Sequence, residues 1–453
     1  MYIKQLYTNC LAQAAYYVES EGEALIIDPL REAEPYINLA KERGAKIKYV
    51  FETHFHADFV SGHIAISSKT DAVIVYGPCA KPTYPALIAF DGEKFDLGKL
   101  KIQVLHTPGH TIESSCFLLF NELNEPYCIF TGDTLLVGDV GRPDLLSGNL
   151  SKEALAALMY DSLNEKIKKL PDYVIVYPGH GAGSACGKNI GKETVSSIGE
   201  QKKNNYAMQN IPKNQFIYNV TKGLALPPAY FFKDAQININ GYQNNELLNS
   251  RINLALTVSG FLNEIKKGAI ILDTRNSEEF GSGFIPGSIN IGLNGDFAIW
   301  VGTLIEFNTP LVIVASPGKE KESITRLARI GYDNVKGFLT DGFETWGNSG
   351  FEIDTIQSIH YSQLDVFTSG KNFVIFDVRK PGENEHLKID GSIRIPLNTL
   401  GELINGLDKT RPYFVYCAGG YRSMIAASML KRNGIKNILN LKGGINVYSP
   451  ALL

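Results

Sequence analysis

Apolar positions along the chain come in short runs separated by polar or turn-forming residues. In the N-terminal part, up to His180, runs of apolar or β-branched residues recur and predict strands at 24–27, 47–51, 72–76, 101–105, 127–130 and 174–177. Polar residues interrupt the apolar stretches of segment 1–29, which predicts two strands there. Segment 151–170 has a helical pattern, with Ser151 at the expected N-cap. This mixture predicts a layered α/β architecture.

The C-terminal part of the chain contains an internal repeat. Segments 271–275, 287–291, 310–314 and 331–335 match segments 375–379, 391–395, 412–416 and 434–438 in the same order. Two copies of one small α/β domain with a mainly parallel sheet are the simplest explanation. The repeat follows a stretch rich in Asn and Gln, 210–249, whose second half we interpret as a domain boundary. We therefore predict domains at 1–245, 250–354 and 355–453.

The composition excludes several classes of protein. The 453 residues are 44% apolar and 20% charged, and 44 basic against 47 acidic side chains give a net charge of −3. This balance offers no electrostatic reason to expect nucleic acid or an anionic membrane as a partner. No run reaches the ~18 apolar residues that a membrane span needs. The six cysteines lack a disulfide spacing, so we expect free thiols and a cytoplasmic location.

Histidines concentrate in the N-terminal part, where six of the eight lie at or before His180. Four apolar runs end in segments rich in potential metal ligands, at 53–58, 108–111, 131–134 and 178–181. Strand ends at one edge of a sheet bring such loops together. Imidazole and carboxylate ligands suit Zn, Fe or Mn. The sequence therefore predicts a metal site in this part of the chain.

These four segments resemble the signature of the metallo-β-lactamase family, HxHxDH followed by His, Asp and His. The resemblance covers about residues 1–245 and implies an αββα sandwich with the metal at one edge. Phe59 stands where the family has the last histidine of HxHxDH, which disfavours a dinuclear zinc hydrolase. His54, His110 and Asp133 remain as a 2-His-1-carboxylate set, an arrangement typical of non-haem Fe(II) oxygenases.

Within this superfamily, the set is similar to that of the persulfide dioxygenases, which share the segment 141–145. The resemblance implies one Fe(II) per chain, with O2 and a thiol persulfide as substrates. It makes five residues neighbours of the metal or part of the substrate pocket: His56, Asp58, His180, Arg142 and Asp144. Arg142 would bind an anionic group of the substrate or form a structural pair with Asp144. Cys186 is either a second sulfur carrier or a small residue at a tight turn.

Segment 415–423 carries the sharpest motif, in which an apolar strand delivers Cys417 into a loop that opens a helix. Glycines allow backbone N–H groups to turn inward as an anion nest, and Arg422 favours a thiolate. The motif resembles that of the rhodanese family, over about 355–453. This resemblance implies that Cys417 carries a persulfide cradled by Ala418, Gly419, Gly420, Tyr421 and Ser423. In the first copy Ala315 stands opposite Cys417, so we predict an inactive rhodanese-like domain.

The whole chain resembles bacterial fusions of a persulfide dioxygenase with an inactive and an active rhodanese-like domain. The resemblance implies oxidation of a low-molecular-weight thiol persulfide to sulfite, and conversion of sulfite with a Cys417 persulfide to thiosulfate, in sulfide detoxification. Glutathione, coenzyme A, cysteine and bacillithiol all remain open as the carrier thiol, and a homo-oligomer (dimer or tetramer) is expected. Two alternatives stay open: a zinc-dependent glyoxalase-II-like thioester hydrolase, and a non-enzymatic persulfide relay or sensor.

Overall fold

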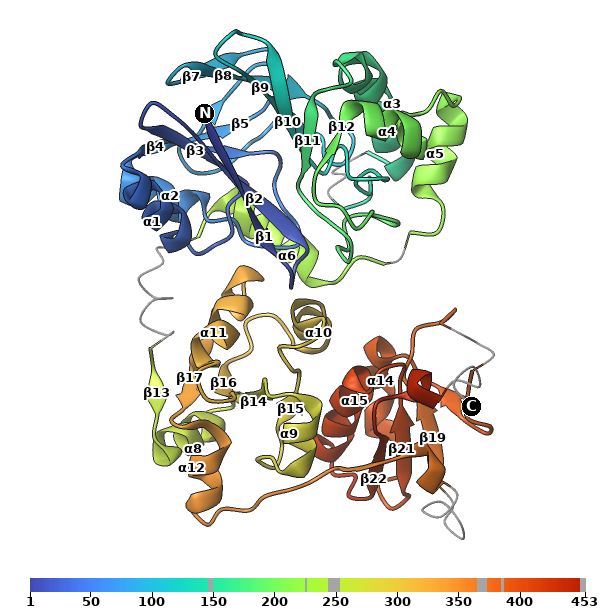
Figure 1. The fold of residues 1–453 in the computed structure, drawn as a ribbon. Coiled ribbons are helices and arrows are strands. Elements are labelled where there is room, and N and C mark those ends of the chain that lie inside the picture. Colours follow the sequence, from blue (N-terminus) through green and yellow to red (C-terminus); the bar gives the residue numbers. More distant parts are fainter. Residues whose placement is uncertain (146–149, 225, 243–252, 365–372, 384–386, 449–453) are drawn as a thin grey trace. The chain divides into compact units, whose positions relative to one another are not determined.

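A computed structural model describes residues 1–145, 150–224, 226–242, 253–364, 373–383 and 387–448 (Figure 1). The chain divides into two compact units: Met1–Asn245 with Ala328–Gly331, and Glu246–Leu327 with Tyr332–Leu453. No helix among the described residues has both the length and the apolar character needed to cross a membrane.

The first unit contains two six-stranded sheets. One has the order β1 (Tyr2–Thr8), β2 (Gln13–Ser20), β3 (Glu23–Ile27), β4 (Lys46–Glu52), β5 (Val73–Tyr76) and β6 (Leu87–Ile88). The prediction of two strands in segment 1–29 was wrong, because Glu21 and Gly22 adopt positive φ angles and turn the chain back into a third strand. The second sheet has the order β12 (Ser196–Ser197), β11 (Ile175–Pro178), β10 (Pro126–Gly132), β9 (Ser115–Phe120), β8 (Leu100–His106) and β7 (Lys94–Leu97).

Three apolar clusters show how the layers of this unit pack. The central cluster joins side chains of both sheets, including Phe51 of β4 and Phe117 of β9, whose rings lie 4.9 Å apart. A second cluster packs helices α1 (Glu34–Arg43) and α2 (His63–Thr70) on the first sheet. A third packs α3 (Lys152–Glu165) and α5 (Lys213–Thr221) on the second sheet. The predicted αββα sandwich is therefore confirmed.

The helix predicted over 151–170 is α3, and it begins where the sequence indicates. The Ser151 hydroxyl accepts a hydrogen bond of 3.1 Å from the Ala154 N–H, which satisfies one of the free donors of the first turn. The short helix α4 (Ile198–Asn204) follows β12. Among the described residues of the unit, the last helix is α6 (Tyr230–Asn240), which lies within the stretch that the sequence suggested as a boundary.

The second unit contains two five-stranded parallel sheets with the same topology. The first has the order β13 (Ala255–Leu256), β17 (Val335–Leu339), β16 (Leu311–Val314), β14 (Ile270–Asp273) and β15 (Ile289–Asn290). The second has the order β18 (Gln357–Ile359), β22 (Ile438–Leu441), β21 (Tyr413–Tyr416), β19 (Val374–Asp377) and β20 (Ile393–Arg394). Each strand of one sheet has its counterpart in the other, in agreement with the repeat seen in the sequence.

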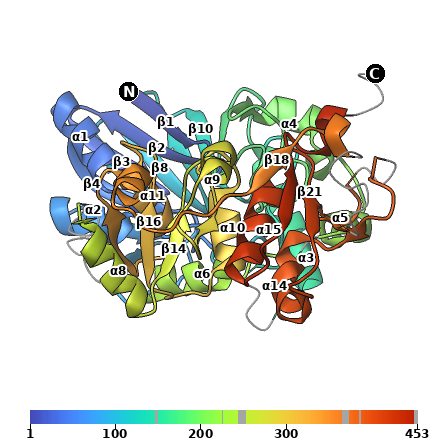
Figure 2. The same ribbon diagram turned by 90° about the horizontal axis from the view of Figure 1, so that it is seen from below.

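The helices of this unit are α8 (Val258–Lys266), α9 (Ser277–Ser282), α10 (Phe297–Leu304), α11 (Glu320–Arg329) and α12 (Gly342–Asn348) in the first domain, and α14 (Leu397–Leu403) and α15 (Tyr421–Arg432) in the second. Helix α15 packs on β21 and β22 of its own domain and on β15 and α9 of the preceding one (Figure 1). Figure 2 shows α15 and β21 in a second view. The two rhodanese-like domains thus contact each other along the helix that follows Cys417.

Candidate metal centre and persulfide loop

The structure brings His54, His110 and Asp133 together at one end of the two sheets. His54 follows β4, His110 lies in the loop after β8, and Asp133 follows β10. One nitrogen or oxygen of each lies within 4.8 Å of the others, and all three side chains are buried. His110 Nε2 is 3.5 Å from Asp133 Oδ2, a spacing compatible with two ligands of one metal ion.

Hydrogen bonds fix which nitrogen each histidine offers. The Thr53 hydroxyl donates to Asp28 Oδ2 over 2.8 Å, so its oxygen accepts the bond of 2.9 Å from His54 Nδ1. His110 Nδ1 lies 2.8 Å from the Arg142 carbonyl, which can only accept a hydrogen bond. Both rings therefore carry their proton on Nδ1 and leave Nε2 unprotonated. Support of this kind from outside the ligand set is usual at metal-binding histidines.

Asp133 completes the donor set with a single oxygen. Its Oδ1 accepts a hydrogen bond of 2.7 Å from His180 Nδ1, whereas the buried Oδ2 accepts none. A buried carboxylate oxygen without a hydrogen bond is costly, and a cation between the three residues would compensate it. Two imidazole nitrogens and one carboxylate oxygen fit a divalent transition-metal ion, with His54, His110 and Asp133 as the residues that would hold it.

His180 supports Asp133 through a hydrogen bond, and with Asp58 and Cys186 it forms a second buried group whose atoms could hold a metal ion. Its Nε2 is 2.8 Å from Asp58 Oδ2, so both ring nitrogens donate to carboxylates. Burial alone would lower the pKa of His180, but the two carboxylates raise it well above its usual value. Burial likewise would raise the pKa of Asp133, but His180 lowers it well below its usual value. Both carboxylates thus stabilise the charged form of His180.

Cys186 lies beside His180 and Asp58. Its Sγ belongs to a buried group with Asp58 and His180 in which the polar atoms lie within 4.8 Å of one another. Burial, and then the carboxylates of Asp58 and Asp133, raise the pKa of Cys186 well above its usual value. The side chain is therefore placed near the candidate metal ligands, but in its thiol form.

Arg142 forms the ion pair that the sequence left as one of two alternatives. Its Nε and Nη2 donate to the two carboxylate oxygens of Asp144 over 2.7 and 2.9 Å. Segment 141–145 begins with Gly141 because a side chain has no room there. A Cβ at this position would lie 2.4 Å from the Asp133 carbonyl oxygen and 2.8 Å from His110 Nδ1. The segment thus supports His110 through its backbone.

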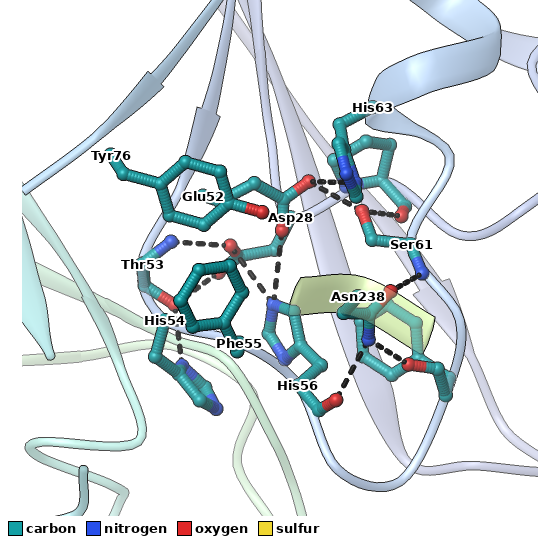
Figure 3. A network of polar contacts seen from close by, with 12 residues as sticks. Asp28, Glu52, Thr53, His54, Phe55, His56, Ser61, His63, Tyr76 and Asn238 are labelled. Atoms are coloured by element: carbon teal, nitrogen blue, oxygen red, sulfur yellow. Dashed lines mark hydrogen bonds and ion pairs between the residues drawn. The ribbon is translucent and has the colours of Figure 1, made fainter. Parts of the chain in front are cut away.

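A second buried polar network adjoins the metal site, and sequence reasoning missed its two carboxylates, Asp28 and Glu52 (Figure 3). His56 Nε2 lies 3.0 Å from Asp28 Oδ1 and 3.5 Å from Glu52 Oε2. Glu52 also accepts a hydrogen bond from the Ser61 hydroxyl, and its Oε1 is 3.4 Å from His63 Nδ1. Burial, and then Asp28, raise the pKa of Glu52 well above its usual value. The only signal for Asp28 and Glu52 in the sequence is that each ends an apolar strand.

Helix α6 holds the loop that carries His54 and His56. The Asn238 amide donates to the carbonyls of His56 and Phe59 over 2.7 and 2.8 Å and accepts a bond of 2.9 Å from the Ser61 N–H (Figure 3). The Phe59 ring stacks on His56 with a centroid distance of 4.3 Å. Phe59 thus fills with an apolar ring the position where the family signature has a histidine.

In the second rhodanese-like domain, Cys417 directly follows β21 and is 1% exposed. The Gly420 N–H donates to Cys417 Sγ over 3.1 Å, and the Ser423 hydroxyl lies 3.5 Å from the same sulfur. Gly420 has a φ of 88°, a conformation that glycine adopts without strain. Ala418, Gly419 and Gly420 lead from β21 into α15, and the Gly420 N–H is the backbone donor that the structure shows on the sulfur.

Arg422 has a partner that the sequence did not reveal. Its guanidinium forms two hydrogen bonds of 2.5 and 2.8 Å with the Glu383 carboxylate, and this contact lowers the pKa of Glu383.

In the first rhodanese-like domain Ala315 follows β16 just as Cys417 follows β21. Its methyl side chain is buried, and the next residue, Ser316, donates to Glu279. This position therefore has no thiol.

Comparison with known proteins agrees with one domain in the N-terminal part of the chain and two repeated domains in the C-terminal part. The family Metallo-beta-lactamase superfamily matches residues 8–180, and the family Rhodanese-like domain matches residues 257–349 and 362–451. A solved metallo-beta-lactamase structure from Staphylococcus aureus subsp. aureus COL is 32% identical with a TM-score of 0.67, and the match covers 75% of this chain and 98% of that one. The chain belongs to the metallo-β-lactamase superfamily. Its superfamily domain precedes two rhodanese-like domains.

Hydroxyacylglutathione hydrolases and persulfide dioxygenases are almost equally similar to this chain. A cytoplasmic hydroxyacylglutathione hydrolase of Arabidopsis thaliana is 33% identical over 39% of this chain and 67% of its own length. A mitochondrial persulfide dioxygenase of Homo sapiens is 32% identical over 35% of this chain and 59% of its own length. Overall identity therefore does not separate a hydrolase from a dioxygenase, and the site residues have to do so.

Proposed function

We propose that this protein is a non-haem Fe(II) persulfide dioxygenase and sulfurtransferase. The single observation that carries the proposal is the donor set of His54, His110 and Asp133, in which each residue has one polar atom held by a neighbour and one left for metal. His54, His110 and Asp133 would hold the ion, and a three-residue set of this kind would leave it open to substrates. An attached domain with a Cys417 loop of the rhodanese type supports chemistry on sulfane sulfur.

Bound Fe(II) would supply the redox chemistry by which O2 oxidises the outer sulfur of a thiol persulfide to sulfite. The protein residues would orient the ion and exclude competing groups. Thr53 and the Arg142 carbonyl fix the two imidazoles, and His180 holds the non-ligating oxygen of Asp133. Phe59 stands where the family signature has a further histidine, so this position offers no imidazole to a second ion. This agrees with the proposal of one metal per chain.

In the second step, Cys417 would carry a sulfane sulfur as a persulfide. Sulfite attacks the outer sulfur of this persulfide, the S–S bond breaks, and its electrons return to Cys417 as the thiolate. The products are thiosulfate and the free enzyme, so atoms and charges balance without a further oxidant. The Gly420 N–H, which already donates to Sγ, stabilises the negative sulfur at each stage. Run backwards, the same reaction transfers the outer sulfur of thiosulfate to the Cys417 thiolate and releases sulfite.

Hydrolysis of a thioester by a zinc form is the second candidate, because a hydroxyacylglutathione hydrolase is an equally similar relative. One feature counts against it: Phe59 has no ligand atom at the position where the family signature has a histidine. The buried group of Asp58, His180 and Cys186 is the feature that favours it, because its atoms could hold a second ion. The carrier thiol, the homo-oligomeric state and a cytoplasmic location stay predictions from the sequence.

A Cys417→Ser variant tests the division of labour between the two sites. We expect it to form sulfite from a thiol persulfide at the wild-type rate and to form no thiosulfate, because the carrier sulfur is absent. Both products are measured by chromatography after derivatisation of the sulfur species. Loss of sulfite formation together with thiosulfate formation would contradict this division.

A further inference from the structure

Arg422, the cationic side chain of the Cys417 loop, already has an anionic partner in the structure. It lies in the first turn of α15. Its Nη1 and Nη2 donate to Glu383 Oε1 and Oε2 over 2.5 and 2.8 Å, so both terminal nitrogens of the guanidinium face one carboxylate. Glu383, and then the Cys417 sulfur, raise the pKa of Arg422. The guanidinium that pairs with Glu383 is therefore also within electrostatic reach of the reactive sulfur.

Glu383 is held in place by its own turn as well as by Arg422. Its Oε1 accepts a hydrogen bond of 2.9 Å from the Lys380 N–H, and its N–H donates to the Lys380 carbonyl over 3.3 Å. The turn follows Arg379, which is fully buried and donates to Asp377 over 2.9 and 2.7 Å. Because the carboxylate is already fixed, the ion pair loses less side-chain entropy than a pair between two mobile surface side chains.

The first rhodanese-like domain has a glutamate at the same place but a different partner for it. Glu279 stands six residues after the end of β14, as Glu383 stands six residues after the end of β19. Glu279 accepts a hydrogen bond of 3.0 Å from the Ser316 hydroxyl. When the loops are aligned on the residues that follow β16 and β21, Glu320 stands opposite Arg422. The glutamate thus reaches this loop in both domains, whereas the arginine belongs to the domain that has the thiol.

The ion pair works against the binding of sulfur oxyanions at the Cys417 loop. Sulfite and thiosulfate carry negative oxygen atoms that suit the two terminal NH2 groups of an arginine. Glu383 occupies these groups, so an oxyanion has to displace the carboxylate or bind next to its negative charge. A thiol persulfide has no oxyanion group at its outer sulfur. Its reaction with Cys417 therefore does not need the guanidinium to be released.

We propose that Glu383 is a positioning residue that sets the donor specificity of the Cys417 site: by holding Arg422, it weakens the binding of sulfur oxyanions relative to thiol persulfides. The proposal rests on the sulfurtransferase function proposed above. Thiosulfate formed at Cys417 then leaves readily and reloads the site poorly. In reloading, the Cys417 thiolate attacks the outer sulfur of thiosulfate and forms a new S–S bond. The S–S bond of thiosulfate breaks, and its electron pair leaves with sulfite.

The test is the anaerobic rate of Cys417 loading in the full-length protein, with thiosulfate or glutathione persulfide as the donor. Loading is followed by the mass of the peptide that contains Cys417, after free thiols are blocked. In Glu383→Gln the guanidinium is released, so we expect the half-saturating concentration of thiosulfate to fall roughly 5-fold. The half-saturating concentration of glutathione persulfide and the maximal rates with both donors should change by less than about 2-fold.

A double-variant cycle shows whether Glu383 acts through Arg422. In an Arg422→Gln background, Glu383→Gln should leave the half-saturating concentration of thiosulfate unchanged, because no guanidinium remains to be released. Glu402→Gln is the matched control, since it removes one carboxylate from an exposed position of α14 in the same domain. It should behave as the wild type with both donors.

An unchanged or higher half-saturating concentration of thiosulfate in Glu383→Gln would overturn the proposal. An equal fall for glutathione persulfide, an equal fall in the Arg422→Gln background, or a loss of loading with both donors would overturn it as well, because Glu383 would then act on the loop in general. If glutathione persulfide loads wild-type Cys417, the sulfurtransferase function stands whatever the result for Glu383. If neither donor loads wild-type Cys417, that function fails, and the proposal fails with it.

Discussion

At the scale of single residues, the candidate metal centre depends on atoms that face away from the metal. His54 and His110 use Nδ1 for a hydrogen bond and leave Nε2 available. The sequence could indicate these two histidines and Asp133, because each follows an apolar run. It could not indicate that Thr53 and Asp28 support His54, since single polar residues at strand ends form no recognisable pattern.

Removal of the Thr53 hydroxyl tests this support. In Thr53→Val the His54 ring loses its acceptor at Nδ1, so both tautomers become accessible and the ring is less well oriented. We expect metal affinity to fall about 10-fold, measured with Co²⁺ in competition with a chromophoric chelator. Thr53→Ser keeps the hydroxyl and should retain wild-type affinity. Equal affinities in the Val and Ser variants would show that the hydroxyl has no such role.

At the scale of elements, the sequence predicted the strands with alternating or isolated apolar runs and missed others. Strand β9 has the sequence SCFLLF and is buried throughout, so it lacks the alternation of a half-exposed strand. The repeat in the C-terminal part predicted two parallel sheets of the same kind, because matched segments in the same order require the same topology. Nothing in the sequence showed that α6 would contact the loop between β4 and α2.

The contact of α6 with that loop makes a prediction about stability. Asn238→Ala would leave the carbonyls of His56 and Phe59 and the Ser61 N–H without their partner in a buried place. We expect a loss of about 2 kcal/mol in the free energy of unfolding, measured by urea denaturation. Gln236→Ala, an exposed position of the same helix, is the control and should change it by less than about 0.5 kcal/mol. Similar losses in both variants would contradict a specific role for the three hydrogen bonds of Asn238.

At the scale of the whole molecule, the chain has two compact units, and the candidate metal ligands lie in the first only. Both tryptophans, Trp300 and Trp346, lie in the second. Tryptophan fluorescence therefore reports on the rhodanese-like part alone, while calorimetry reports on all of the chain. The sequence predicted the order of the domains. It did not predict that α15 would contact β15 and α9 of the preceding rhodanese-like domain, because contacts between domains leave no periodic pattern.

Metal removal should separate the two units thermally. A metal ion at about 100 times its dissociation constant stabilises the unit that binds it by ~2.7 kcal/mol. A chelator should therefore lower the temperature of the calorimetric transition of the first unit by several degrees. The transition followed by tryptophan fluorescence should not move. A fluorescence transition that shifts together with the calorimetric one would show that the two units unfold as one.

The central claim is that the first unit oxidises a thiol persulfide, and oxygen uptake tests it most directly. The full-length protein is loaded anaerobically with Fe(II), mixed with glutathione persulfide in air-saturated buffer, and followed with an oxygen electrode. We predict uptake of O2 matched by sulfite plus thiosulfate, and none in His110→Ala. Absence of uptake with several persulfides, together with thioester cleavage by the zinc-loaded protein, would contradict the dioxygenase and favour the hydrolase.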